Sequence, residues 1–551
     1  MTADLVIKGK IFTADKKCLF AQAVAVKDGK FLAVGTEEEI KGYIGKKTAI
    51  EKAKGLVIPG IVESHAHVSC ATEFTKGVML PPLCNDYHVY LEEIREYWKN
   101  HPNVKVITGS GYDNGAFGKI GPTAELLDCI TKDIPIVMIS SDHHSRWLNS
   151  AALELTGITN DTPNPEAGEI VRYPDGRATG WLKESAGSFT SHIIPETTAE
   201  EYAQAIAYYQ EIALKNGVTA VYEPMYDAKK DYIIRAEGWR ILEKEHTLKL
   251  MSRLGYSIEA NDDVKRAFQN MEQISQLLSD CQKVKLSSAK FFVDGVIECH
   301  TAYLSEPYTD QPEEKGKPTC SQEWLEETAL YALRHGYDLH AHVIGDGALD
   351  MALKAYIKVQ NKRKEEEKEK DIEFRNVFTH LQIAKPCQIN EMSKHQIVAV
   401  TNPYWHSKNP LYFEQVELPF IGKERAEKQY PMKSLADRNI PMGQASDFPI
   451  TMPPTSMDSL HFMVNRAEPQ TKNCLNEKEC LDLTTALCIL TIGGAYSLRL
   501  EHLIGSIEVG KKADFAFIDK DPYCLNPENL FMCQIEKTFI DGVCVYFNEG
   551  E

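Results

Sequence analysis

Long apolar runs are missing from this sequence. Although 43% of its 551 residues are hydrophobic, no run approaches the ~18 apolar residues of a transmembrane helix. The first ten residues include Asp4 and no long apolar core, so we expect no signal peptide. These absences argue against a membrane as a partner and favour a cytoplasmic protein.

Positive charge and patterned cysteines are also scarce. The chain has 61 Lys and Arg against 79 Asp and Glu, a formal net charge of −18, which argues against nucleic acid or an anionic membrane as a partner. The fourteen cysteines are scattered without Cys-x-x-Cys pairs, so we expect reduced thiols and no disulfide framework. The charge-dense residues 361–371 are expected to be the solvated end of a helix. The remaining composition is ordinary for a globular enzyme.

Both ends of the chain contain alternating, β-branched segments with turns at glycine. These segments span residues 4–13, 22–34, 504–519 and 537–546. Such runs, joined by turn-forming pairs such as Asp-Gly, predict hairpins. Because the two ends of a domain commonly lie close together, we expect one small β-sandwich domain composed of residues 1–58 and 503–551.

Between the two ends, short apolar strands alternate with helical stretches. Helices are expected at Ala199–Asn216 and Gln322–His335, where polar and apolar residues follow helical spacing. Eight such βα units predict an α/β fold, a (β/α)8 TIM barrel over residues 59–502, with its active site at the C-terminal ends of the strands. The strand candidates are residues 61–67, 217–223, 248–256, 286–293, 338–343, 376–381, 397–402 and 440–446.

The gap between the first two strand candidates is too long for one crossover connection. It contains strand-like segments of its own at 104–108 and 134–140, together with helical stretches. We therefore expect residues 70–215 to form a cap subdomain inserted between barrel strands 1 and 2. A cap over the barrel mouth would shape a substrate pocket and exclude water.

One stretch of the sequence bears on which functional site the barrel could carry. Residues 55–68 combine an apolar run, a Pro59-Gly60 turn and a short strand that ends at His65 and His67. Residues two apart on a strand share a face, and two imidazoles on one face can bind a single metal ion. Two histidines near a strand end can equally line a polar surface, because a lone His-x-His motif is short.

Other strand ends carry further ligand-type side chains. Taken singly, a strand-end histidine is usually structural, a strand lysine usually extends to solvent, and a strand-end aspartate often caps a helix. Their occurrence together at the ends of several strands predicts a metal site. The candidates are His65, His67, Lys290, His340, His342, His380 and Asp447.

Several motifs, spread nearly end to end, match one known family. They are Pro-Gly-Ile-Val-Glu-Ser-His-Ala-His (59–67), Asp-His-His-Ser-Arg-Trp-Leu-Asn-Ser-Ala-Ala-Leu (142–153), Lys-Phe-Phe-Val-Asp-Gly (290–295), His-Val-Ile-Gly-Asp (342–346), Thr379-His380, Ser446-Asp447 and Ile-Gly-Ser-Ile-Glu-Val-Gly-Lys-Lys-Ala-Asp (504–514). In these motifs the sequence resembles the amidohydrolase superfamily of metal-dependent hydrolases. Within it, the sequence is similar to the third amidohydrolase family, which includes N-substituted formamide deformylases.

The resemblance implies a (β/α)8 barrel with a two-ended β domain and one or two divalent metal ions, usually zinc. The implied ligands are His65, His67 and Asp447 for one ion, and His342 and His380 for the other. Lys290 would be N6-carboxylated and bridge the ions, since a carbamate supplies two anionic oxygens. His340 is the rival of His342, but the Val-Ile-Gly-Asp that follows His342 matches the family, so His340 would instead contact a ligand.

The implied reaction is hydrolysis of a C–N bond in an amide, an N-substituted formamide or a cyclic amide. Metal lowers the pKa of water to ~7, so metal-activated hydroxide would attack the carbonyl, and Asp447 would carry the proton to the leaving nitrogen. Two alternatives stay open: a mononuclear-metal deaminase of an aminated heterocycle, with Lys290 unmodified, and a catalytically silent barrel scaffold. Also left open are the identity of the small-molecule substrate, the native metal and whether the protein forms a homodimer.

Two places depart from the family pattern. Glu63 stands where the family often has Asp, and residues 142–144 contain two adjacent histidines where one is expected. His144 is the family's histidine and either reaches the pocket or is structural. Glu184 and His406 are further substrate-binding candidates, and the aromatic residues before His406 could wall an apolar substrate group.

Overall fold

The computed structural model divides the chain into two compact units, one of residues 1–69 with 209–551 and one of residues 70–208. The structure describes residues 1–548 apart from 82–83, 85, 118–120, 142–143, 166–167, 226–230 and 368–372. Asp142 and His143 of the motif at 142–153, and part of the charged stretch 361–371, therefore lie outside the described residues.

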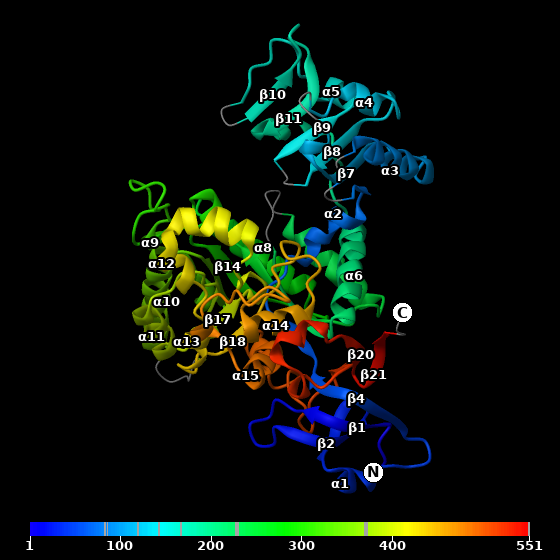
Figure 1. The fold of residues 1–551 in the computed structure, drawn as a ribbon, viewed down its shortest axis with the longest axis vertical. Helices are drawn as coiled ribbons and strands as arrows, with labels where there is room; N and C mark the ends of the chain where they lie inside the picture. The colour runs from blue at the N-terminus through cyan, green and yellow to red at the C-terminus, as the bar shows by residue number, and fades with distance from the viewer. Residues whose placement is uncertain are drawn as a thin grey trace. The chain divides into compact units, whose positions relative to one another are not determined.

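The first unit contains the predicted barrel, an eight-stranded parallel sheet (Figure 1). Neighbouring strands pair in order from β5 to β18, and Ser64 N–H donates to the Gln444 carbonyl (2.9 Å), so the sheet is nearly closed. The α/β barrel fold predicted from the sequence is confirmed. Its strands are β5 (Ile61–Glu63), β12 (Val218–Met225), β13 (Met251–Ser257), β14 (Val284–Phe292), β15 (Asp338–Val343), β16 (Val377–His380), β17 (Val398–Thr401) and β18 (Met442–Gln444).

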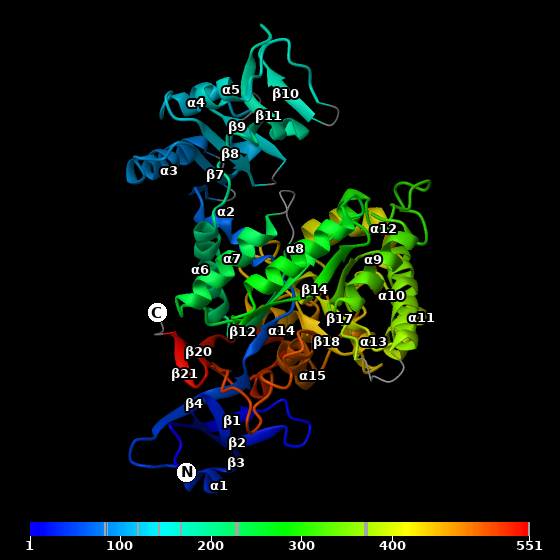
Figure 2. The ribbon, with the colours of Figure 1, turned by 180° about the vertical axis from the view of Figure 1, so that it is seen from behind.

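Apolar runs in the sequence match the double-sided burial of the strands. All eight residues of β12 are buried, as expected for a parallel sheet covered on its faces. Helices lie outside the strands (Figure 2). In one of them, α8, the buried residues Ala267, Phe268, Met271 and Ile274 follow helical spacing, and Asp263 caps the first turn. The helices of this region are α7 (Tyr232–Lys244), α8 (Val264–Leu277), α9 (Gln322–Arg334), α10 (Asp346–Glu366), α11 (Pro386–Lys394), α12 (Leu418–Lys428), α13 (Met432–Ala436), α14 (Ser456–Asn465), α15 (Leu483–Cys488) and α16 (Gly494–Ser497).

Both ends of the chain contribute to a second sheet in the same unit, where N-terminal and C-terminal strands lie side by side (Figure 1). Its seven strands, in spatial order, are β21 (Val543–Phe547), β20 (Ile535–Ile540), β19 (Phe515–Ile518), β4 (Ala49–Pro59), β1 (Leu5–Phe12), β2 (Phe20–Lys27) and β3 (Lys30–Gly35). Strand β4 pairs with β19 from the other end of the chain. Its buried residues, such as Val57, pack with Phe515 and Phe517.

The turn from β4 into the first barrel strand requires glycine. A Cβ atom on Gly60 would lie 2.1 Å from Thr219 Oγ1 of β12, a distance that no side chain tolerates without a shift. Gly60 N–H donates to the Asp514 carbonyl (2.9 Å), so the C-terminal motif residue Asp514 fixes this turn. The turn fixes the start of β5, the short strand that leads to His65.

The second unit has its own mixed sheet of six strands. In spatial order they are β10 (Gly168–Arg172), β11 (Ala178–Glu184), β9 (Ser145–Leu148), β8 (Ile136–Ser140), β7 (Ile107–Tyr112) and β6 (Val78–Met79). The buried Trp147 packs against Phe117 and Tyr112 in the centre of this unit. Among the described residues of the whole chain, none of the helices is both long and apolar enough to span a bilayer.

Candidate metal centre

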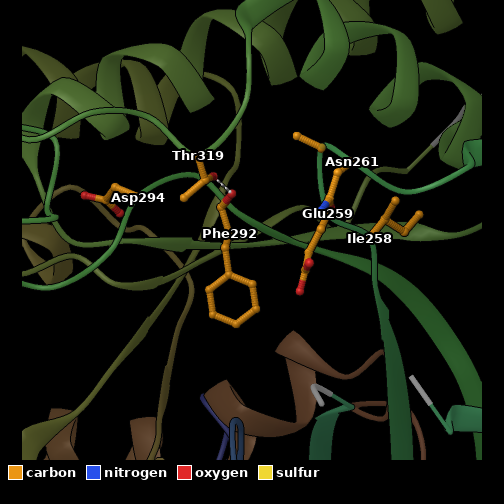
Figure 3. A pocket seen from close by; sticks show the side chains of 7 residues that line it. Ile258, Glu259, Asn261, Phe292, Asp294 and Thr319 are labelled. Carbon is orange, nitrogen blue, oxygen red and sulfur yellow. Dashed lines mark hydrogen bonds between the residues drawn. The ribbon is translucent and has the colours of Figure 1, made fainter. Parts of the chain in front are cut away.

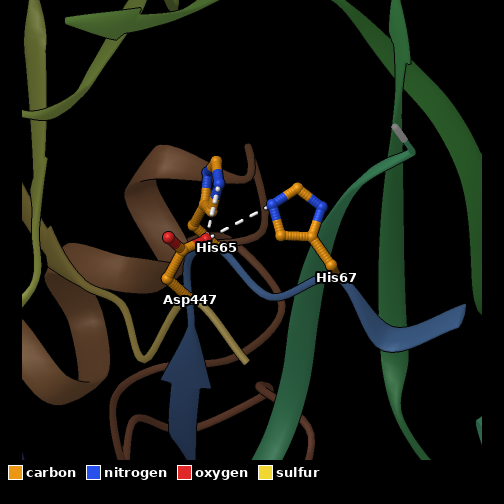
Figure 4. A group of neighbouring side chains, drawn as sticks. All are labelled: His65, His67 and Asp447. Atoms are coloured by element: carbon orange, nitrogen blue, oxygen red, sulfur yellow. Dashed lines mark ion pairs between the residues drawn. The ribbon is translucent and has the colours of Figure 1, made fainter. Parts of the chain in front are cut away.

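Loops at the ends of β5 and β18 bring His65, His67 and Asp447 together (Figure 4). His65 Nε2 and His67 Nε2 each lie 3.3 Å from Asp447 Oδ1. One ligand atom from each residue lies within 4.8 Å of the other two. Within the described ranges, these three side chains form the group of His, Cys, Asp or Glu residues able to hold a metal ion.

Backbone hydrogen bonds fix the two loops against each other. Asp447 N–H donates to the His65 carbonyl (3.0 Å). The Glu63 carboxylate accepts from His65 N–H (3.1 Å) and from Ser446 N–H (3.0 Å), and so links both loops. Burial raises the pKa of Glu63 to about 8, against the lowering effect of these two donors. Asp447 has a left-handed φ of 57°, a strained conformation of the kind that clusters at functional sites.

His340 lies behind His65. A hydrogen bond joins His65 Nδ1 to His340 Nε2 (3.1 Å), and His340 Nε2 also bonds Thr379 Oγ1. The His340 ring stacks on Tyr222 with centroids 4.4 Å apart. His65 Nδ1 is thereby occupied, which leaves Nε2 directed at Asp447. Partners of this kind orient metal-binding histidines.

His342 and His380 adjoin the three-residue group without belonging to it. Their ring centroids are 4.5 Å apart, and the His380 centroid is 5.3 Å from that of His65. His380 Nδ1 is hydrogen-bonded to Asn402 Oδ1 (2.8 Å), and His342 Nε2 to the Gly295 carbonyl (3.1 Å). These bonds leave His380 Nε2 and His342 Nδ1 as the nitrogens that could serve as ligands.

Burial favours the neutral form of these imidazoles. Burial, together with the charge of Lys290, lowers the pKa of His65 to about 3 and the pKa of His342 to about 4. Burial opposes the ionisation of Asp447, yet His65 and His67 hold the pKa of this carboxyl well below its usual value. A carboxylate together with imidazole nitrogens is a donor set suited to zinc-like divalent cations.

Two buried polar atoms bear on whether these residues could bind a cation. Lys290 is fully buried in β14, and burial lowers the pKa of its amine to about 7. In the described part of the chain, Lys290 Nζ has no hydrogen-bond partner, and the contacts of Asp447 Oδ1 are the two imidazole nitrogens 3.3 Å away, which do not meet hydrogen-bond geometry. Buried polar atoms are rarely left unpaired. The residues present therefore fit a divalent cation beside Asp447.

A cavity of about 370 Å³ opens beside this centre. His342, His380 and Asp447 lie in its wall, and the Trp405 ring stacks on His380 with centroids 5.5 Å apart. Much of the remaining wall is aromatic or apolar. The other lining residues are Val296, Glu298, Ile344, Gln382, Tyr404, Ser407, Asn409, Tyr412, Tyr430 and Ile450.

A second cavity of about 540 Å³ lies near the ends of β13 and β14 (Figure 3). In Figure 3 the side chains of Glu259 and Phe292 extend in the same direction. The Phe292 ring lies 5.2 Å from the His342 ring, centroid to centroid, and 5.0 Å from Lys290 Nζ. The Asp294 carboxylate, also in this wall, accepts from Ile344 N–H (3.0 Å). Phe292 therefore lines this cavity and also lies close to Lys290 and His342.

The three predicted substrate-binding residues are divided between the two units. His144 and Glu184 belong to the unit of residues 70–208, where His144 Nδ1 lies 2.9 Å from Glu184 Oε2 and both side chains are exposed. His406 is fully buried, and its ring stacks on Tyr430 with centroids 4.6 Å apart. Tyr430 lines the cavity beside the metal centre, whereas His406 is not among the described lining residues. A substrate contact by any of the three stays a prediction.

Comparison with known proteins identifies the family. A model described as "Amidohydrolase family" matches residues 53–546. The chain is 28% identical over 535 residues to "Protein LONG AFTER FAR-RED 3" of Arabidopsis thaliana, covering 95% of this chain and 88% of that protein. It is 28% identical over 574 residues to "N-substituted formamide deformylase" of Arthrobacter pascens, covering 99% of this chain and 98% of that protein.

A solved structure supports the same fold. An uncharacterized metal-dependent hydrolase of Pyrococcus horikoshii superimposes with a TM-score of 0.74 at 22% identity, covering 95% of this chain and 99% of that one. The family match and the long alignments together establish a hydrolase that acts on carbon–nitrogen bonds. This chain belongs to the amidohydrolase family.

Proposed function

We propose that the protein hydrolyses the C–N bond of a small amide, an N-substituted formamide or a cyclic amide, with Asp447 as the proton carrier. The observation that carries this proposal is the meeting of His65 and His67 with Asp447, which lines a partly aromatic cavity. A cytoplasmic location is part of the same proposal.

The proposed ligands of one divalent ion, zinc by preference, are His65, His67 and Asp447, and those of a second ion are His342 and His380. When bound, such an ion lowers the pKa of water and polarises a carbonyl oxygen. Lys290 would join the two ion sites as a carbamate. Its buried amine has no hydrogen-bond partner among the described residues. This supports the assignment, since a carbamate would give that position the anionic oxygens that paired cations need.

Asp447 is the group that can move a proton between water and the leaving nitrogen. It lies in the cavity wall, and its pKa is held well below the usual value by His65 and His67 although burial opposes this. The carboxylate is therefore ionised and able to accept a proton at neutral pH. General acid–base groups of this kind contribute roughly 10²–10⁴-fold to rates.

The cavity wall supports a substrate with a flat apolar group and an N–H donor. Trp405 and neighbouring tyrosines supply aromatic surface. Gln382 Nε2 donates to Glu417 Oε1 (3.0 Å) and to Gln429 Oε1 (2.9 Å). Both donors of the Gln382 amide are thereby used, so its oxygen is the atom available to a ligand. We assign that oxygen as an acceptor for a substrate N–H.

The proposal is tested by screening the zinc-reconstituted enzyme against N-substituted formamides, N-acyl amines, cyclic imides and aminated heterocycles. Release of formate or another acid supports amide hydrolysis. Asp447→Asn is expected to lower kcat by roughly two to four orders of magnitude while much of the bound metal is retained on His65 and His67. Near-wild-type turnover in this variant would remove the proton-carrier assignment.

A second candidate is deamination of an aminated heterocycle with one bound metal ion. The observation that favours it is that, in the described residues, His65, His67 and Asp447 form one metal-type group to which His342 and His380 do not belong. In that case ammonia would be the product, one metal ion would suffice, and activity would not depend on added bicarbonate. A silent scaffold is disfavoured because every ligand position implied by the family carries a ligand-type side chain.

A further inference from the structure

Two cysteines that look unrelated in the sequence lie side by side beyond helix α14. The sulfur atoms of Cys474 and Cys480 are 3.7 Å apart. Both thiols are free and partly buried. A disulfide bond is about 2.05 Å long, so the sulfurs would have to approach each other by about 1.6 Å to form one.

The loop that carries the pair is anchored next to each cysteine. Leu475 N–H donates to the Arg466 carbonyl (2.7 Å), and Leu481 N–H donates to the Met463 carbonyl (3.0 Å). Both leucine side chains are buried. The fold therefore already holds the two sulfurs close, and closing a bond between them would cost little further loop entropy.

The pair is accessible to small molecules. Cys474 and Cys480 both line a cavity of about 390 Å³, together with Lys472 and Glu477. This cavity is built from residues other than those around the proposed metal ligands. A small-molecule oxidant can thus reach the thiols without entering the site of hydrolysis.

A soft metal ion is the other ligand that two neighbouring thiols could take. His461 lines the same cavity, but its Nε2 bonds the Ala467 carbonyl (3.1 Å) and its Nδ1 bonds Asn465 (3.0 Å). Within the described residues, the two cysteines belong to no group of three metal-type ligands. The geometry thus favours a covalent bond between the sulfurs.

We propose that Cys474 and Cys480 form a reversible disulfide, with a small-molecule disulfide such as oxidised glutathione as the oxidant. One protein thiolate attacks the external disulfide, forms a mixed disulfide and releases one glutathione thiolate. The second protein thiol loses its proton and displaces the second glutathione. Overall, two protein thiols are oxidised to one disulfide, and one external disulfide is reduced to two thiols.

The thiolate is the nucleophile in this exchange. Burial and the neighbouring Cys474 raise the pKa of the Cys480 thiol.

The pair is connected to the wall of the cavity beside the metal centre. The buried Arg466 guanidinium donates to the carbonyls of Leu475 (2.6 Å), Tyr430 (3.1 Å) and Gln429 (3.1 Å). Leu475 directly follows Cys474, and Tyr430 lines the cavity beside the metal centre. A disulfide between Cys474 and Cys480 would restrain the loop at Leu475. It would thereby restrain the Arg466 guanidinium, which also donates to the Tyr430 carbonyl.

Trypsin offers a direct test because Lys478 lies between the two cysteines. The folded, full-length protein is incubated with oxidised glutathione, blocked with N-ethylmaleimide and digested without reduction. We expect peptides 473–478 and 479–499 to stay joined, and to separate after treatment with dithiothreitol.

Matched variants separate this link from others, because peptide 479–499 also contains Cys488. The link should survive in Cys488→Ser and disappear in Cys480→Ser. The proposal is overturned if the two peptides are joined through Cys488, if glutathione stays on a single cysteine, or if both thiols remain free to react with N-ethylmaleimide. A link that forms only in denatured protein overturns it as well.

Discussion

Glu63→Ala is expected to weaken both the fold and metal binding. The carboxylate accepts hydrogen bonds from His65 N–H and Ser446 N–H, and alanine leaves these two buried donors without that acceptor. An unpaired buried donor costs about 1–3 kcal/mol, so two predict a loss of roughly 2–6 kcal/mol in the free energy of unfolding. Water entering the vacated space would bring the loss toward the lower end.

Metal affinity should fall in the same variant because both linked loops carry proposed ligands. Residues that support metal ligands typically contribute about 10–100-fold in affinity. Competition with a chromophoric chelator measures the affinity, and urea unfolding of the metal-free protein measures the stability. Unchanged values in both experiments would refute the linking role of Glu63.

Glu479→Ala is the matched control. Its carboxylate is buried and also accepts two hydrogen bonds, from Ser434 N–H (2.8 Å) and from the Ser434 hydroxyl. It is not part of the metal-type group in the described residues. This variant should lose stability and keep its metal affinity, which separates general destabilisation from an effect on the site.

Two further substitutions test how the terminal sheet is joined to the barrel. Gly60→Ala should cost about 1–3 kcal/mol in the free energy of unfolding, because its Cβ would lie 2.1 Å from Thr219 Oγ1. Thr219→Ala in the same chain should restore part of that loss. If the losses of the two single variants simply add in the double variant, the contact is contradicted. Burial raises the pKa of Asp514 to about 6 against the lowering effect of the Asp541 N–H. Because its unfolded pKa is lower, the folded state binds more protons, and stability falls as pH rises through about 6. The asparagine in Asp514→Asn does not titrate. The free energy of unfolding of this variant, relative to the wild type, should therefore rise by up to ~3 kcal/mol between pH 4 and pH 7. A difference in urea unfolding that does not depend on pH would contradict this.

The barrel could be predicted from the sequence because each strand is a short apolar run followed by polar residues. The ends of these runs were less exact, for a local reason. The predicted strand 376–381 ends at His380 in the structure, since His380 and Leu381 have φ values of 79° and 52°. The predicted strand 440–446 ends at Gln444, shortly before Asp447 turns with a φ of 57°. The predicted strand 61–67 ends earlier still, at Glu63, so His65 and His67 lie in the loop that follows it and not on one strand. All three deviations lie at proposed ligands, where the backbone leaves the regular strand conformation.

Partners of the site residues were harder to predict, because sequence spacing does not give the rotation of a side chain. Nothing local indicates that Glu63 links two loops or that His340 bonds His65. Asn402, which is hydrogen-bonded to His380, could have been predicted as a site residue because it directly follows β17 at a strand end. The Cys474–Cys480 pair was missed because the six-residue separation matches no common cysteine motif.

The central claim is that His65, His67 and Asp447 bind a catalytic metal ion at the barrel mouth. The most direct measurement is an anomalous difference map at the zinc edge from crystals of the zinc-reconstituted protein. We predict a peak coordinated by Nε2 of both histidines and by the Asp447 carboxylate. Zinc bound elsewhere, or a His67 or Asp447 side chain turned away from His65 in the zinc-loaded crystal, would contradict the account.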